Sequence, residues 1–301
     1  MRPSIPPYQA RRVDMESAGD LIRMEMSSEE GVGDKRRRDA NVNRTPLLVR
    51  VVLVMIVGGA LGYGSSFLSP CKRVITTPVK TGGVITMADG AEVDVRLKSP
   101  FTAIVAGPTG SGKTRMLTRL IMSAAEVADP PPVEIIYCYG VWQEGYESLR
   151  DRVRFHEGMM DVKEEIPADG RNRWLIVDDL MEEAGASKNT STVYTKYSHH
   201  RNVSVFMVVQ NLFFGGRTAS INSHYFFLFK NPRDATGVRT LFTQMFPTNW
   251  RYAMEAYTDA TKQPHGFLLV DLKPRTPDDM RLLGNYGTDD MMVYTPKNGT
   301  I

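Results

Sequence analysis

GPTGSGKT, at residues 107–114, matches the phosphate-loop pattern G-x-x-x-x-G-K-[ST] in full. An apolar run, TAIVA at 102–106, comes directly before it and has the composition of a buried strand. A helical pattern follows from Arg115, with apolar residues at Leu117, Leu120, Ile121 and Ala124. A strand, a glycine-rich loop and a helix in this order predict a P-loop.

The chemistry of such a loop explains its residue types. A polyphosphate must lie against bare backbone N–H groups, which glycines leave uncovered, and the positive end of the following helix adds to the attraction. The lysine reaches the β- and γ-phosphates, and the threonine hydroxyl binds the Mg²⁺ that bridges them. A strand-to-helix turn without a ligand is the alternative. We expect ATP and Mg²⁺ as cofactors, bound by Gly107, Pro108, Thr109, Gly110, Ser111, Gly112, Lys113 and Thr114.

Acidic and amide residues follow two later apolar runs. Asp178 and Asp179 come directly after WLIV at 174–177, and Gln210 follows VSVFMVV at 203–209. Because the carboxyl ends of parallel strands meet in one crevice, we expect all three residues near the phosphates. Asp178 would hold Mg²⁺ together with the loop threonine, Asp179 would polarise the attacking water, and Gln210 would sense the γ-phosphate. A helix cap at Asp179 and a loop anchor at Gln210 are the structural alternatives.

Two arginines are candidates for a guanidinium that stabilises the transferring phosphoryl group. Arg217 lies in FFGGRTAS at 213–220, and Arg233 lies in KNPRD at 230–234, just after the run YFFLF. In ring-shaped ATPases such an arginine comes from the neighbouring subunit. For either residue, a surface or structural role is the alternative.

Six apolar runs predict the strands of one sheet. Each is apolar on both faces and rich in β-branched and aromatic residues, as buried parallel strands covered by helices on two sides must be. We expect an α/β fold with a central, mostly parallel sheet, in which the prolines at 130–132 end the helix after the phosphate loop. The runs are TAIVA (102–106), EIIYCY (134–139), WLIV (174–177), VSVFMVV (203–209), YFFLF (225–229) and GFLLV (266–270).

Composition divides the rest of the chain. Residues 1–46 are polar, with a basic cluster at 35–38, and predict a disordered tail that is either a solvated leader or an arm contacting DNA or a capsid. Residues 72–100 predict a β-rich lead-in with a turn at Asp89-Gly90. The P-loop ATPase domain is expected at 101–283, followed by a C-terminal tail at 284–301.

The segment at 47–71 is apolar, and its run VVLVMIVGGALGYGSSFL at 51–68 is a candidate membrane anchor. As a helix this run would span about 27 Å, which is marginal for a bilayer core. The positive-inside tendency would place the phosphate loop outside the cell, where ATP is not supplied. An anchor of reversed topology, a buried hairpin and a removable leader therefore remain open alternatives.

Length and charge exclude several classes of protein. With 301 residues, 42% of them hydrophobic, the chain can form one large or two ordinary domains. Two cysteines exclude a disulfide framework, and the five scattered histidines argue against a zinc site. There are 37 basic and 34 acidic residues, a formal charge of +3, so any contact with nucleic acid would be local.

The chain resembles the genome-packaging ATPases of Polinton (Maverick) elements and related double-stranded DNA viruses, of the poxvirus-type group in the FtsK/HerA superfamily. The likeness runs from Lys98 to Leu283, and the ordered set is far more specific than the phosphate loop alone. Its segments are IVAGPTGSGKT, WLIVDD, SHHRNVSVFMVVQNLF, SINSHYFFLFKNPRD and GFLLVDLKPRTPDDMRLL. The nucleotide loop, the two acids and the sensor of the family fall on the residues named above. Both arginines lie in stretches similar to the family's, and the first hundred residues depart from its pattern.

This resemblance implies a RecA-like, additional-strand P-loop fold, in which the Gln210 strand lies between the phosphate-loop strand and the Asp178 strand. It also implies a homo-oligomeric ring that pumps double-stranded DNA into a preformed capsid inside the host cell, in the virion or at an assembly site in nucleus or cytoplasm. The partners would be DNA, contacted through its phosphates, and capsid vertex proteins. The region 142–172, with its arginines, is a candidate DNA contact. A P-loop kinase acting on a small molecule and a membrane-anchored nucleotide-binding scaffold are the competing functions.

Overall fold

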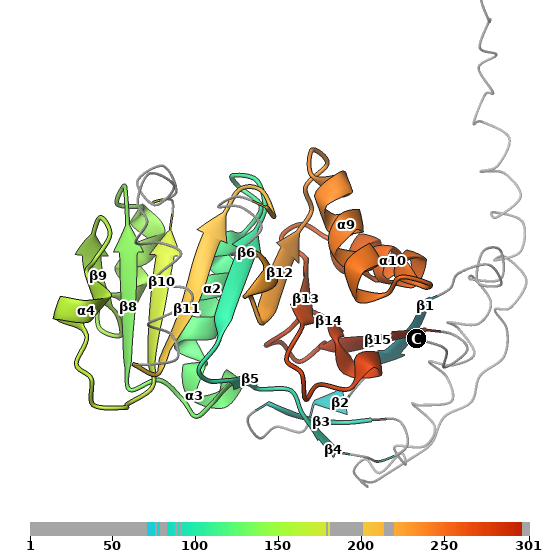
Figure 1. Cartoon of the computed structure of the whole chain (residues 1–301), viewed down its shortest axis with the longest axis horizontal. Coiled ribbons are helices and arrows are strands. Elements are labelled where there is room, and N and C mark those ends of the chain that lie inside the picture. Colours follow the sequence, from blue (N-terminus) through green and yellow to red (C-terminus); the bar gives the residue numbers. More distant parts are fainter. Residues whose placement is uncertain are drawn as a thin grey trace, which may run out of the picture. The chain divides into compact units, whose positions relative to one another are not determined.

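The computed structural model describes residues 71–75, 77–78, 83–87, 90, 92–178, 180, 201–213 and 220–296. Ten strands form one sheet (Figure 1), in the order β1-β15-β14-β13-β12-β6-β11-β10-β8-β9. In that order they are β1 (Cys71–Ile75), β15 (Met292–Pro296), β14 (Leu282–Gly284), β13 (Phe267–Asp271), β12 (Tyr225–Phe229), β6 (Thr102–Ala106), β11 (Val203–Val209), β10 (Arg173–Asp178), β8 (Glu134–Tyr139) and β9 (Arg154–Glu157).

The six strands from β12 to β9 run parallel to one another. Within them β11 lies between β6 and β10, with Met207 paired to Ile104 on one side and to Val177 on the other. This confirms the α/β fold with an additional strand between the phosphate-loop strand and the Asp178 strand. The carboxyl ends of these strands share one edge of the sheet, so the residues that follow them can meet there.

The other end of the sheet is antiparallel, which corrects two expectations. The run at 266–270 was expected to be parallel, but it forms β13, which pairs antiparallel with β12. A strand buried on both faces has the same apolar composition in either direction, so the sequence carries no sign of this reversal. The second correction is β15, which lies within the expected C-terminal tail and pairs with β14 and β1.

Alternating side chains divide the core between the two faces of the sheet. Along β6, Ala103 and Val105 pack into one apolar cluster, whereas Ile104 and Ala106 pack into the other. The helix α2 (Lys113–Met122) supplies Met116, Leu117, Leu120 and Ile121 to the first cluster. The helices α9 (Ala235–Met245) and α10 (Trp250–Ala260), beside β12 and β13 in Figure 1, supply the second. Both faces are therefore covered, as the sequence predicts.

The helix after the phosphate loop is shorter than expected. It ends at Met122, where Ser123 interrupts it, and a short α3 (Ala124–Val127) and β7 (Ala128–Asp129) come before the prolines. The Ser123 hydroxyl donates to the Arg119 carbonyl, 2.9 Å away, which gives the last turn of α2 a side-chain partner. The prolines therefore follow the end of this helical region and do not cause it.

Smaller elements surround the sheet. The lead-in contains β2 (Thr77–Pro78), β3 (Val84–Thr86) and β4 (Glu92–Asp94), which form a three-stranded antiparallel sheet, and β5 (Leu97–Lys98), which pairs with β7. After β8 come a 3₁₀ helix η1 (Glu144–Leu149) and, after β9, a short α4 (Val162–Glu165). A second 3₁₀ helix, η3 (Asp278–Met280), comes before β14.

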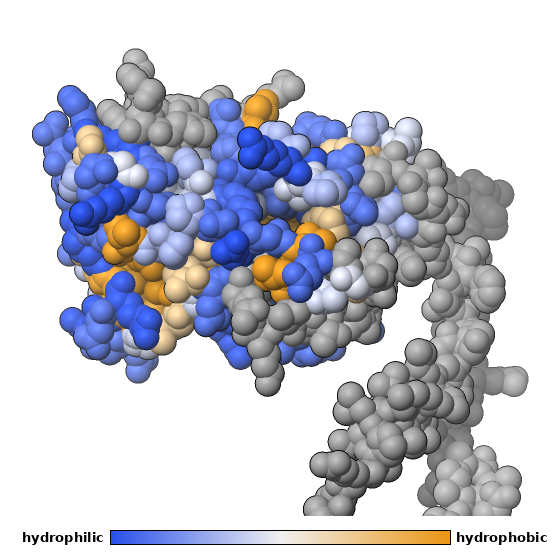
Figure 2. All heavy atoms as spheres, turned by 90° about the horizontal axis from the view of Figure 1, so that it is seen from below, coloured by the Kyte–Doolittle hydropathy of each residue, from blue (hydrophilic) through white to orange (hydrophobic). Residues whose placement is uncertain are grey.

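Figure 2 shows one face of the molecule from below, where hydrophilic side chains surround two areas of apolar side chains. The large apolar side chains most exposed among the described residues are Val141, Ile221 and Val133, with exposed fractions of 76%, 66% and 61%. Single exposed apolar residues of this kind are normal on protein surfaces. Among the described residues, no helix has the length and apolar character needed to cross a bilayer. The candidate anchor at 51–68 lies outside the described residues.

Candidate nucleotide-binding site

The phosphate loop connects β6 to α2 in the way its glycines require. Gly112, directly before the first residue of α2, has a φ of 103°, a left-handed conformation that glycine adopts without strain. A Cβ atom at Gly107 would lie 2.6 Å from the Cβ of Phe229 on the neighbouring strand, and a Cβ at Gly112 would lie 2.8 Å from His265. The loop therefore approaches its surroundings so closely that side chains at these two positions would have to displace a neighbour.

Two polar side chains of the loop, those of Lys113 and Ser111, can donate hydrogen bonds to an anion. The ammonium Nζ of Lys113 donates to the carbonyls of Gly107 and Pro108, at 2.7 and 3.1 Å. The Oγ of Ser111 is buried and has no hydrogen-bond partner within the described part of the chain. A buried hydroxyl without a partner is costly, and a phosphate oxygen would supply one. Together with the helix start, these groups fit a polyphosphate.

Asp178, the last residue of β10, is 5% exposed and receives two hydrogen bonds on the same oxygen. The hydroxyl of Tyr137 on β8 donates to Oδ2 at 2.5 Å, and the hydroxyl of Tyr146 on η1 donates at 3.0 Å. Burial, followed by the nearby charge of Asp178, raises the pKa of Tyr137 well above its usual range. Tyr137 therefore remains a neutral donor to this carboxylate.

Several of the predicted residues line one cavity of about 290 Å³. The loop residues Gly112, Lys113 and Thr114 line it, with Asp178 from β10 and Gln210 from the end of β11. The Thr114 hydroxyl and the Asp178 carboxylate are hard oxygen ligands of the kind that Mg²⁺ prefers. The donor set therefore fits a magnesium ion bound next to the phosphates.

Gln210 also lines a second cavity of about 680 Å³, together with Pro108 and Arg233. Two hydrogen bonds connect the loop after β12, which carries Arg233, to the loop after β11. The amide Nδ2 of Asn231 donates to the Gln210 carbonyl at 3.1 Å, and the Leu212 backbone N–H donates to Asp234 at 2.7 Å. Arg233 and Gln210 thus line the same cavity, at the edge of the sheet that carries the phosphate loop.

Two predicted site residues, Asp179 and Arg217, lie outside the described residues, so their roles stay predictions. Sequence reasoning missed the two tyrosines that bind Asp178, and it missed Asn231 and Asp234. A signal existed for Tyr137, because a tyrosine in an otherwise apolar strand needs a partner for its hydroxyl when it is buried. That signal does not say which residue the partner is.

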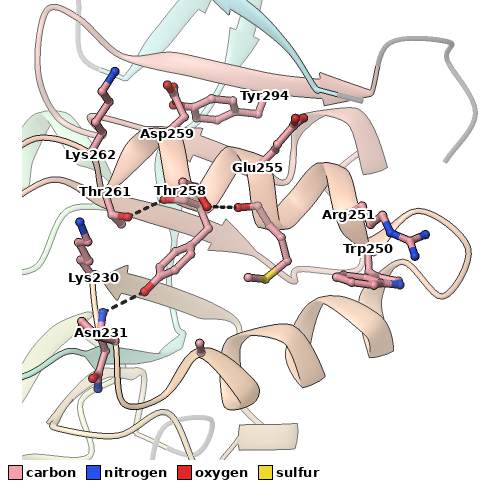
Figure 3. Close-up of a pocket in the computed structure, with 14 residues that line it drawn as sticks. Lys230, Asn231, Trp250, Arg251, Glu255, Thr258, Asp259, Thr261, Lys262 and Tyr294 are labelled. Atoms are coloured by element: carbon pink, nitrogen blue, oxygen red, sulfur yellow. Dashed lines mark hydrogen bonds between the residues drawn. The ribbon is translucent and has the colours of Figure 1, made fainter. Parts of the chain in front are cut away.

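A larger cavity, of about 970 Å³, lies between α10 and the loop after β12. Figure 3 shows Lys230 and Asn231 on one side of it and Trp250 and Arg251 on the other. The backbone N–H of Asn231 donates to the Tyr257 hydroxyl at 3.1 Å. None of the residues predicted to bind nucleotide lines this cavity, so its size does not make it the nucleotide site.

No protein-family model and no curated protein matches the chain. Its fold is similar to the genome-packaging NTPase B204 of Sulfolobus turreted icosahedral virus 2, in complex with sulfate, at 12% identity and a TM-score of 0.40 over 59% of this chain and 94% of that one. B204 of Sulfolobus turreted icosahedral virus, a DNA-packaging ATPase, is 13% identical, with a TM-score of 0.41 over 59% of this chain and 96% of that one. The cytoplasmic domain of the type VII secretion ATPase EccC from Thermomonospora curvata is 14% identical, with a TM-score of 0.39 over 74% of this chain and 28% of that one. These values describe similarity of fold alone.

Proposed function

We propose that the chain hydrolyses ATP in a Mg²⁺-dependent reaction. The observation that carries this proposal is the single cavity lined by Lys113, Thr114, Asp178 and Gln210, residues that are far apart in the sequence. A cation for the phosphates, two oxygen ligands for a metal and an amide for the γ-phosphate are the groups that phosphoryl transfer needs. Arg233 in the adjoining cavity adds a second cation within the same chain.

Each residue has a distinct task in this proposal. Thr114 and Asp178 would hold Mg²⁺, which neutralises phosphate charge when bound. Lys113 exchanges its two neutral carbonyl acceptors for phosphate oxygens, whose negative charge attracts the ammonium more strongly. Gln210 donates to the γ-phosphate and accepts from the attacking water, which its amide can do at once. Asp179 accepts the proton of that water.

We further propose that hydrolysis moves double-stranded DNA into a capsid, in a homo-oligomeric ring at the assembly site in the host cell. The support is the ordered set of motifs from Lys98 to Leu283, together with β11 lying between β6 and β10. Such a motor must accept any sequence, so it grips phosphates and not base edges. Exposed arginines at 150 and 152, in the candidate DNA region, have suitable charge for this contact.

The test measures phosphate release by the full chain with ATP and Mg²⁺, with and without duplex DNA. We expect activity that EDTA abolishes, that duplex DNA stimulates and that falls in added salt. In Lys113→Ala, nucleotide affinity should fall about 10- to 150-fold, because a hydrogen bond to a charged group contributes about 1.5–3 kcal/mol. Exposed Lys163→Ala is the matched control and should bind as the parent does.

The two competing functions give different results. A P-loop kinase would transfer phosphate to a hydroxyl-bearing small molecule faster than to water, and DNA would leave its rate unchanged. A nucleotide-binding scaffold would bind ATP without releasing phosphate. Absence of magnesium-dependent phosphate release under all conditions would contradict the proposed hydrolysis.

A further inference from the structure

The carboxylate of Asp178 is held by a small buried network that no sequence motif contains. Tyr137 and Tyr146 are 0% and 1% exposed, and both of their hydroxyls donate to Oδ2. The tyrosines come from different elements, β8 and η1, and their ring centroids lie 4.9 Å apart. Two donors from independent elements on one oxygen restrict how the carboxylate can turn.

The rings of these tyrosines are themselves fixed by aromatic neighbours. Phe155 on β9 lies 5.6 Å from the Tyr137 ring and 5.7 Å from the Tyr146 ring, measured between centroids. Trp142 lies 5.5 Å from Tyr146 and 5.0 Å from Phe155. The cluster therefore positions two hydroxyls, and the hydroxyls position one carboxylate at the wall of the nucleotide cavity.

We propose that Tyr137 and Tyr146 are positioning residues for the Mg²⁺ ligand Asp178, an inference that rests on the proposed ATP hydrolysis. Partners that hydrogen-bond to a metal ligand orient it, and their loss commonly lowers metal affinity about 10- to 100-fold. The two tyrosines would act on metal binding and leave the contacts between nucleotide and phosphate loop intact. This separates their role from that of Lys113, which faces the phosphates directly.

The chain offers a matched control in Tyr139. It lies on the same strand as Tyr137, and its ring contacts Trp142, Tyr146 and Phe155 at 5.3, 6.0 and 6.1 Å. Within the described part of the chain its hydroxyl makes no hydrogen bond to Asp178. Tyr139→Phe therefore removes a hydroxyl from the same aromatic cluster without touching the carboxylate.

The experiment titrates Mg²⁺ into the full chain with a fluorescent ATP analogue and measures nucleotide binding. In Tyr146→Phe and Tyr137→Phe we expect the half-saturating Mg²⁺ concentration to rise about 10-fold, and further in the double variant. The affinity for the analogue in EDTA should stay within about 2-fold of the parent. Bound Mn²⁺, counted by electron paramagnetic resonance in place of Mg²⁺, should fall in parallel, and Tyr139→Phe should match the parent in each measurement.

Three results would overturn the inference: an unchanged Mg²⁺ requirement in both single variants, an equal shift in Tyr139→Phe, or an equal loss of affinity in EDTA. The two single variants are independent, so one that fails to fold, as judged by circular dichroism, leaves the other to decide. If the parent chain itself binds no nucleotide at any Mg²⁺ concentration, the proposed function fails and this inference fails with it. If the parent binds nucleotide with Mg²⁺ and the tyrosine variants have the same half-saturating Mg²⁺ concentration, only this inference fails and the proposed function stands.

Discussion

The Lys113 ammonium shows what a single residue contributes to this loop. It donates to the carbonyls of Gly107 and Pro108, at 2.7 and 3.1 Å, and so holds the first turn of the loop in place. In the proposed ATP complex, a phosphate would compete with these carbonyls for the ammonium, and its negative charge adds a Coulombic attraction that a carbonyl lacks. Nucleotide binding would then be linked to the conformation of the loop through this side chain.

Asp179 is the predicted acceptor for the proton of the attacking water. We expect Asp179→Asn to bind ATP about as tightly as the parent and to lower kcat by at least about 100-fold, because the amide cannot accept the proton of the attacking water. Equilibrium binding and phosphate release on the same samples measure the two effects. Asp178→Asn is the comparison, and it should weaken Mg²⁺-dependent binding as well. Equal losses of affinity in Asp179→Asn and Lys113→Ala would contradict the assigned roles.

The thiol of Cys138 on β8 should react slowly with alkylating reagents. The thiol is 1% exposed, and burial raises its pKa to about 11. At pH 8 roughly one Cys138 thiol in a thousand would be ionised, and the thiolate is the form that reacts. Burial also keeps the reagent away from the sulfur. We expect iodoacetamide to modify Cys138 at least about 100-fold more slowly in the native chain than in guanidinium, as measured by peptide mass. Rapid modification of a chain with native circular dichroism would refute this.

Single residues differ in how far the sequence predicts them. The loop residues 107–114 and Asp178 were predictable because a motif of adjacent residues, or a strand followed by a carboxylate, carries their chemistry. The hydrogen bond from Tyr146 to Asp178 joins residues 32 positions apart, and nothing local to either residue encodes it. Contacts of this kind follow only from the order of the strands.

At the scale of elements, the loops after β11 and β12 behave as one unit. Asn231 binds the Gln210 carbonyl, and Asp234 accepts from Leu212. Arg233 lies between these two contacts in the sequence and lines a cavity with Pro108 and Gln210 of the same chain. This placement favours a contact between Arg233 and the nucleotide of its own chain.

Mixing subunits tests this placement. We expect Arg233→Ala to lose most phosphate release, and we expect no recovery when it is mixed with Lys113→Ala chains, because neither chain then has a complete site. An arginine acting between subunits would give the opposite result, since mixed rings would join an intact loop to an intact Arg233. Recovered activity would therefore assign Arg233 to its neighbour's site, and Arg217→Ala in the same mixture is the parallel measurement.

The strands were more predictable than their directions. All six apolar runs form strands, because continuous burial leaves a mark on composition. The direction of β13 was predicted wrongly, because the helices α9 and α10 lie between β12 and β13, and a helical connection of this kind is typical of parallel strands. The existence of β9 was missed, since its pattern RFHE at 154–157 is only partly buried and contains two charges.

At the scale of the whole molecule, β1 connects the N-terminal region to the sheet. It pairs with β15 over five residues, from Cys71 opposite Pro296 to Ile75 opposite Met292. A chain that begins at residue 76 would lose these backbone hydrogen bonds and keep β2, and each lost bond contributes about 1 kcal/mol net. We expect its Tm to fall by more than about 4 °C, since 1 kcal/mol corresponds to about 2–4 °C at this size.

The control is a chain that begins at residue 63, which keeps β1. This shorter deletion keeps every residue that the structure describes, so the pairing of β1 with β15 stays intact. We expect its Tm to match that of the parent. The longer deletion should also aggregate more readily, because it exposes the edge of β15. Equal melting temperatures for the two deletions would show that β1 contributes nothing to stability.

The central position of β11 has a mechanical consequence. The strand is bonded to β6 on one side and to β10 on the other, so the end that carries Gln210 is anchored to the rigid middle of the sheet. In the proposed motor, loss of the γ-phosphate would therefore leave this strand in place and act on the residues that follow it, Asn211–Phe213. The hydrogen bonds from Asn231 to the Gln210 carbonyl and from Leu212 to Asp234 would pass that change to the next loop.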